Sequence, residues 1–142
     1  MSTYADTSFL VSLYVLDANS ALAAGRMERV RLPILLTPFG ELELTNAISL
    51  RQFRRELRPS KVNAALSLVR KDLADGILQL KPLAASVFDR AKQMARRRTA
   101  QLGTRTLDVL HVASALELQV EEFYTFDRNQ EKLAKAEGLV VG

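Results

Sequence analysis

Short apolar runs alternate with longer amphipathic segments along the chain. The short runs predict β-strands, which we place at residues 3–5, 34–37, 77–80 and 123–126, with a fifth at 139–141. The longer segments are rich in good helix formers and predict helices, one beginning near residue 7 and others at 21–30, 39–57, 60–74, 85–100, 107–119 and 128–136. Strands that alternate with helices predict a parallel sheet, because parallel neighbours need crossover connections. We expect an α/β fold, a three-layer α/β/α sandwich with a central parallel sheet of four to five strands.

Two of the predicted connections, 39–74 and 85–119, each contain a pair of helices. Only one helix of each pair can run straight back along the sheet, so the other must pack beside it or project from it. The sequence has no internal repeat, low-complexity tract or linker-like segment, which favours one domain over the whole chain.

The composition is that of an ordinary folded protein, with 48% apolar and 25% charged residues among 142. The chain has no cysteine, which excludes a disulfide framework and a thiolate metal site and favours the reducing cytoplasm. Its apolar runs fall well short of the roughly 20 residues that a membrane helix needs. An aspartate at position 6 argues against a secretory signal. We expect a cytoplasmic protein that does not span a membrane.

Acidic side chains stand where ligands bind in open α/β sheets, beyond the carboxyl ends of the strands. Asp6 directly follows the first predicted strand, and Asp127 directly follows the fourth. Glu43 lies in the early turns of the helix after the second strand, and Asp108 in the first turn of the helix that leads into the fourth. We therefore expect four carboxylates to converge on one end of the sheet.

Each of these acids taken alone also has a structural explanation. Asp6 can simply cap its helix, and Asp127 with Gln130 resembles a capping box. The helix dipole favours Asp108 near a helix start, and Glu43 can be a solvated helix residue. The combination changes this balance, because four anions in one cleft repel one another and a bound divalent cation removes that cost. Oxygen ligands without His or Cys suit Mg²⁺, or Mn²⁺ as a substitute.

Four segments resemble the successive acidic motifs of PIN-domain ribonucleases. They are YADTSF at 4–9, ELELTNA at 41–47, RTLDVLHVA at 105–113 and TFD at 125–127. The likeness covers nearly the whole chain in the family's order and spacing, and within the family it is greatest to the VapC toxins of bacterial toxin–antitoxin pairs. The resemblance implies a single PIN-like nuclease domain over 1–142 that acts as a Mg²⁺-dependent endoribonuclease on RNA. It also implies a homodimer and a cognate antitoxin that blocks the active-site groove.

The resemblance places four residues around the metal, which are Asp6, Glu43, Asp108 and Asp127. Glu41 is a weaker alternative to Glu43, because the motif Glu-Leu-x-Asn-Ala is met by Glu43 followed by Asn46. Some relatives carry a further acid shortly after the last aspartate, where this chain has Asn129. A full second-metal site is therefore not implied.

A cation held by carboxylates suits phosphodiester hydrolysis, because it polarises the phosphoryl oxygen and lowers the pKa of a bound water. We expect Asp6 and Asp108 to be direct ligands, and Glu43 and Asp127 to ligate through water or to act as general bases. Three hydroxyls can hold these carboxylates by hydrogen bonds, although hydroxyls beside a helix start are more often caps. They belong to Thr7, Ser8 and Thr125.

The charge pattern suits a nucleic-acid partner. Twenty Lys and Arg exceed sixteen Asp and Glu by four, and setting the four site acids aside doubles that excess to eight. Four arginines would share one face of the predicted helix 39–57 and its extension, where they either bind phosphates or stay solvated. They are Arg51, Arg54, Arg55 and Arg58. The run 96–98 covers a wide arc and is expected to be mostly solvated surface.

His111, the only histidine, lies in a segment that is apolar almost all round, so we expect a hydrogen-bonded core histidine in preference to a catalytic one. The chain has no nucleophile elbow, P-loop or dinucleotide-binding glycine motif, which leaves those enzyme classes unsupported. Three functions stay open: a toxin ribonuclease, a PIN nuclease of RNA maturation, and a non-catalytic PIN-like binding module whose acids serve as caps.

Overall fold

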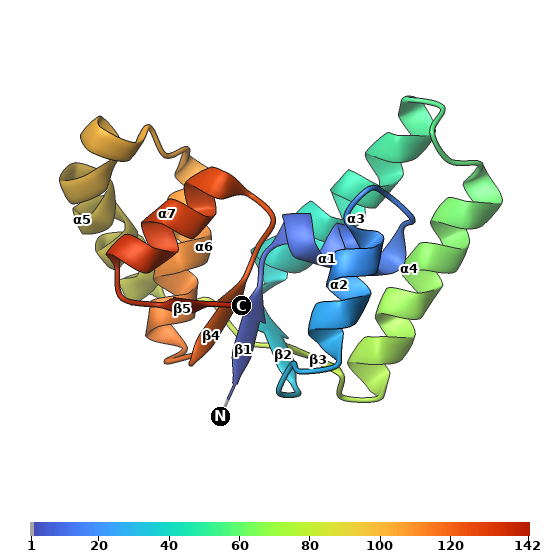
Figure 1. Ribbon diagram of the computed structural model, residues 1–142, viewed down its shortest axis with the longest axis horizontal. Coiled ribbons are helices and arrows are strands. Elements are labelled where there is room, and N and C mark those ends of the chain that lie inside the picture. The colour runs from blue at the N-terminus through green and yellow to red at the C-terminus, as the bar shows by residue number, and fades with distance from the viewer. Residues whose placement is uncertain (1) are drawn as a thin grey trace.

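The computed structural model describes residues 2–142, and its elements follow the predicted order (Figure 1). The strands are β1 (Thr3–Ala5), β2 (Ile34–Leu36), β3 (Leu78–Leu80), β4 (Glu122–Tyr124) and β5 (Val140–Val141). The helices are α1 (Thr7–Tyr14), α2 (Ser20–Met27), α3 (Pro38–Phe53), α4 (Pro59–Ala74), α5 (Ala85–Leu102), α6 (Thr106–Glu117) and α7 (Arg128–Ala136). Within residues 2–142, none of the helices combines the length and the apolar character that crossing a bilayer requires.

The five strands form one parallel sheet in the order β3-β2-β1-β4-β5. Tyr4 of the central strand β1 stands opposite Leu35 of β2 and Phe123 of β4. Since all strands run the same way, their carboxyl ends share one edge, from which α1, α3 and α7 start. The prediction of a parallel α/β sheet with five strands is confirmed.

Helices cover both faces of the sheet because successive strand residues point to opposite layers. Tyr4, Leu35 and Phe123 pack in a core with α5, α6 and α7. Ala5 and Ile34 pack in a second core with α1 to α4. Figure 1 shows these two groups of helices on opposite sides of the sheet, so the predicted three-layer sandwich is confirmed.

The first connection holds two helices, α1 and α2, where helices near residue 7 and at 21–30 were predicted. The second connection differs from the prediction. The helix predicted at 39–57 ends at Phe53, because Arg55 adopts a left-handed conformation with φ 59° and Pro59 starts α4. The expectation that four arginines share one helical face is therefore wrong. Arg51 lies in the last turn of α3, and the other three lie in the turn at the projecting end of the α3–α4 hairpin (Figure 1).

The core position Ile48 on α3 tests this packing. Ile48→Ala should lower the free energy of unfolding by about 2–5 kcal/mol, because the fully buried side chain leaves a cavity against β2 and α1. Leu42→Ala on the same helix is the matched control, since Leu42 is largely exposed and should change stability by less than about 0.5 kcal/mol. Urea unfolding of both variants measures the difference, and equal effects would contradict the assigned layers.

Candidate functional site

A pocket of about 560 Å³ opens at the edge of the sheet where the strands end. Three of the four predicted acids line it: Glu43 from α3, Asp108 from the first turn of α6, and Asp127 at the start of α7. Asp6 is fully buried and does not line the pocket. It is joined to the pocket through Ser8, which lines the pocket and hydrogen-bonds to it. The fold thus brings together residues that lie far apart in the sequence.

Asp6 sits at the end of β1 and caps α1. Its Oδ1 accepts hydrogen bonds from the Ser8 hydroxyl at 2.7 Å and the Phe9 amide at 3.0 Å. Its Oδ2 accepts one from the Thr125 hydroxyl at 2.5 Å. Burial raises the pKa of Asp6, and the nearby His111 and the three donors oppose that rise. The hydrogen bonds from the surrounding hydroxyls thus stabilise the ionised form of Asp6, which burial alone would disfavour.

Glu43 is the last member of a chain of hydrogen bonds that begins in the core. Tyr4 Oη lies 2.7 Å from Nδ1 of the buried His111, and His111 Nε2 lies 2.6 Å from Oε1 of Glu43. Thr7 also donates its hydroxyl to Oε1 of Glu43. The side chain of Thr37, the cap of α3, accepts from the Gly40 amide at 3.2 Å.

Burial raises the pKa of Tyr4 well above its ordinary value, so Tyr4 keeps its proton. With a neutral imidazole we expect this chain to have one direction. The Tyr4 hydroxyl then donates to Nδ1 of His111, and the proton on Nε2 points to Glu43. Burial on its own would raise the pKa of Glu43, but the interactions with His111 and the hydrogen bond from Thr7 outweigh it and lower the pKa. Glu43 is therefore ionised at neutral pH.

Asp108 and Asp127 are bridged by Arg105, the residue that caps α6. Oδ2 of Asp108 accepts from the Arg105 backbone amide at 2.9 Å and from Nε at 3.3 Å. The Nη2 of Arg105 donates to Oδ2 of Asp127 at 3.0 Å. Oδ1 of Asp127 accepts from the Asn129 and Gln130 amides at 2.8 and 3.0 Å. Asn129 thus contacts the site through its backbone amide.

Three of the acids also hydrogen-bond at helix starts, as their structural explanation predicts. Asp6 and Asp127 accept hydrogen bonds from amides in the first turns of α1 and α7, and Asp108 accepts one from the backbone amide of Arg105 at the start of α6. Capping and site chemistry do not exclude each other, because a helix N-terminus that holds a carboxylate also fixes where its oxygens point.

The oxygen atoms around the pocket are of the chemical type that ligates a hard cation. Carboxylate oxygens predominate, and Oε1 of Gln130, which lines the pocket, is buried without a hydrogen-bond partner in the structure of residues 2–142. Over the same residues, no three His, Cys, Asp or Glu side chains are grouped closely enough to hold a metal as they stand. The guanidinium of Arg105 instead bridges two of the acids.

Two of the predicted RNA-binding arginines lie beside the acidic pocket. Arg51 and Arg54 line an adjoining pocket of about 400 Å³ that shares Thr7, Ser8 and Asp127 with it. Ion pairs with Asp17 at 3.7 Å and Glu56 at 3.3 Å hold Arg51 in place. Arg55 and Arg58 line neither pocket.

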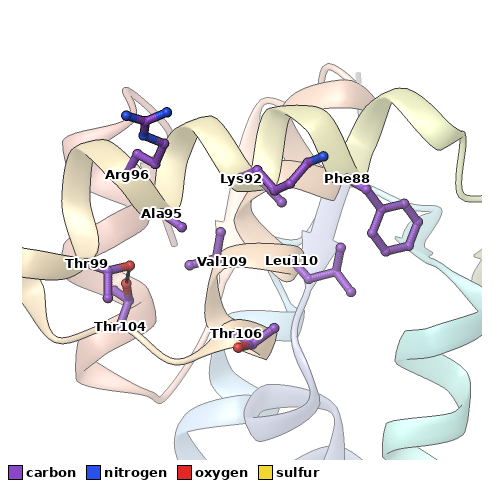
Figure 2. Close-up of a pocket in the computed structure, with 10 residues that line it drawn as sticks. Phe88, Lys92, Ala95, Arg96, Thr99, Thr104, Thr106, Val109 and Leu110 are labelled. Carbon is purple, nitrogen blue, oxygen red and sulfur yellow. Dashed lines mark hydrogen bonds between the residues drawn. The ribbon is translucent and has the colours of Figure 1, made fainter.

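A larger pocket, of about 630 Å³, lies between α5 and α6 and has a different character (Figure 2). Its walls include Phe88, Val109 and Leu110, with Lys92 and Arg96 from α5. No acid lines it, so it does not offer the ligands for cation chemistry. It meets the acidic pocket at Thr106, which lines both.

Three residues gain a place in the site that the sequence analysis did not give them. His111 is the core histidine that was expected, yet it also contacts Glu43. Arg105 directly precedes the third acidic motif, and Gln130 lies three residues after Asp127, and these positions were the available signals. Glu41 does not line the pocket, which favours Glu43 of the two alternatives.

Comparisons with known proteins agree with this fold. The family model described as PIN domain matches residues 3–136. Among solved structures, the chain is similar to the Mycobacterium tuberculosis toxin VapC20, described as sarcin–ricin loop cleaving, at 16% identity and a TM-score of 0.72, over 97% of this chain and 96% of that one. It is also similar to FitAcB from Neisseria gonorrhoeae at 17% identity and a TM-score of 0.68, over 98% and 95%. No curated protein sequence matches.

The direction of the hydrogen-bond chain can be measured at the single imidazole of the protein. Nitrogen-15 NMR should find His111 protonated on Nε2, and Tyr4→Phe should shift its Nδ1 resonance, because that atom loses its donor. Tyr4→Phe should also lower the free energy of unfolding by about 1–3 kcal/mol, the effect of leaving a buried acceptor unpaired. Tyr14→Phe is the control, since that hydroxyl donates to Asp72 instead. A proton found on Nδ1 in the unsubstituted protein would contradict the assigned direction.

Proposed function

The chain belongs to the PIN domain family, and on that premise we propose that it is a Mg²⁺-dependent endoribonuclease, the toxin of a toxin–antitoxin pair. The observation that carries the proposal is the meeting of three carboxylates from α3, α6 and α7 in one pocket, above a fourth that is buried. The unpartnered Gln130 oxygen in the same pocket supports a ligand there. We treat residues 1–142 as one nuclease domain.

Burial separates the roles of the four acids. Asp6 and Asp108 are almost fully buried, which suits direct ligation of Mg²⁺. Glu43 and Asp127 are partly exposed, on the side from which water and substrate approach, which suits ligation through water or orientation of the attacking water. When bound, the cation supplies Lewis-acid polarisation of a phosphoryl oxygen.

Glu43 enters the site as a carboxylate. The His111 and Thr7 hydrogen bonds lower its pKa, so it is unprotonated at neutral pH and can orient the attacking water by accepting a hydrogen bond from it. The Tyr4–His111 contact orients the imidazole, which in turn holds the Glu43 carboxylate. His111 is in this sense a positioning residue.

RNA is the substrate class that the charges favour. Arg51 and Arg54 lie next to the acidic pocket, and Arg55 and Arg58 extend the basic surface to the end of the α3–α4 hairpin. These cations can hold phosphates beside an acidic centre. The description of VapC20 as a loop-cleaving toxin supports the toxin role. A homodimer, a cognate antitoxin and a cytoplasmic location belong to the same proposal.

Asp108 provides the direct test of activity. Asp108→Asn should reduce Mg²⁺-dependent cleavage of RNA by more than about 100-fold, because loss of a ligand exceeds the usual effect of its supporting residues. Asp89→Asn on α5 is the matched control, since Asp89 is exposed, pairs with Lys92 and should leave cleavage unchanged. Circular dichroism checks that both variants fold. Full activity in folded Asp108→Asn would remove the proposal.

A non-catalytic binding module is the second candidate, because three of the acids serve as helix caps. Binding of Mg²⁺ separates the two functions. At a concentration of 100 times the dissociation constant, Mg²⁺ should stabilise a nuclease by about 2.7 kcal/mol, whereas caps alone give no such effect. Thermal unfolding in millimolar Mg²⁺ and in EDTA measures this, with Asp108→Asn as the variant that should lose the response. An unchanged melting temperature would favour the binding module.

A further inference from the structure

Arg105 is the residue whose position the proposed function does not explain. Resting on that function, we propose that Arg105 is a built-in counter-ion of the acidic pocket. A divalent cation takes its place between Asp108 and Asp127, and the released guanidinium then binds a phosphate of the RNA at the mouth of the pocket. Arg105 is thus a residue that exchanges partners during loading of the site.

The contacts place one guanidinium among three carboxylates. Its Nε lies 3.3 Å from Asp108 and its Nη2 lies 3.0 Å from Asp127. Its charge also interacts with Glu43 across the pocket. Of the residues that line this pocket in the described chain, Arg105 is the sole lysine or arginine.

The exposure of the three partners shows how the exchange can occur. The Arg105 side chain is 71% exposed, against 2% for Asp108 and 23% for Asp127. The Arg105 guanidinium can therefore move into solvent without disturbing the core, whereas the carboxylates of Asp108 and Asp127 stay in place. The Arg105 backbone stays fixed as well, because its amide donates to Asp108 at the start of α6.

Charge makes the exchange favourable. A single positive charge neutralises only part of three carboxylates, while a divalent cation compensates twice as much. The two cations repel at contact distance, so both cannot occupy the same carboxylate oxygens. Once released, a planar guanidinium with several donors is well suited to a phosphate.

The α6 start fixes where the released side chain can reach. Gly103 ends α5 in the left-handed region with φ 63°, and the Thr99 and Thr104 hydroxyls hydrogen-bond at 2.8 Å across the turn. This turn sets Arg105 at the mouth of the pocket, next to Thr106 and Leu107, which also line it. A phosphate that approaches the acids passes this residue.

The test compares Arg105→Gln with Arg96→Gln, an equal change of charge on α5 that leaves the acidic pocket intact. Mn²⁺ binding is measured by electron paramagnetic resonance of the free ion. Arg105→Gln should bind Mn²⁺ about three- to tenfold more tightly than the unsubstituted protein, as expected for removing exposed competing ion pairs. Arg96→Gln should bind it with unchanged affinity, and Arg105→Lys should fall between.

The second measurement is the affinity for a nuclease-resistant phosphorothioate RNA at saturating Mn²⁺. Arg105→Gln should bind this RNA several-fold more weakly, with the salt slope of the affinity reduced by about one. Unchanged or weaker Mn²⁺ binding in Arg105→Gln, when the unsubstituted protein binds the ion, would overturn the exchange alone. Unchanged RNA affinity would overturn the transfer to phosphate. Absence of Mn²⁺ binding in every variant would overturn the proposed function together with this inference.

Discussion

The structure depends on how four carboxylates are kept together at one edge of a parallel sheet. Neighbouring carboxylates repel one another, and burial makes the charged form of each carboxylate still less favourable. The fold gives every one of these acids a positive or hydrogen-bonding partner. Asp6 has the start of α1 and two hydroxyls, Glu43 has His111, and Asp108 and Asp127 share Arg105. The acids can therefore be close without being fully neutralised.

The core and the site are connected by hydrogen bonds instead of being independent parts. Tyr4 is a fully buried residue of the central strand, stacked on Phe123, and its hydroxyl orients His111. His111 in turn holds Glu43 at the pocket wall. A change in the packing of Tyr4 would thus shift His111 and, through it, the Glu43 carboxylate. This connection explains why a histidine occupies an otherwise apolar helix face.

The negative groups of the pocket are incompletely compensated. One guanidinium serves two carboxylates, and a buried amide oxygen of Gln130 has no partner within residues 2–142. Gln130 and both of these acids line the same pocket. A fold selected only for stability would pair these groups fully, so their arrangement fits a site that binds positive charge.

The sequence by itself determined the alternation of strands and helices and the position of Asp6 at the end of β1, because hydrophobic periodicity is local. Asp127 was predicted directly after its strand, but β4 ends at Tyr124 and Asp127 instead caps α7. The sequence did not determine where α3 stops, since a single left-handed residue, Arg55, moved three arginines off the helix. Only the tertiary structure decided the partners of the acids. Tyr4 and His111 are 107 positions apart, His111 and Glu43 are 68 apart, and Arg105 and Asp127 are 22 apart. Such pairs follow from how helices pack on the sheet, which no local pattern encodes.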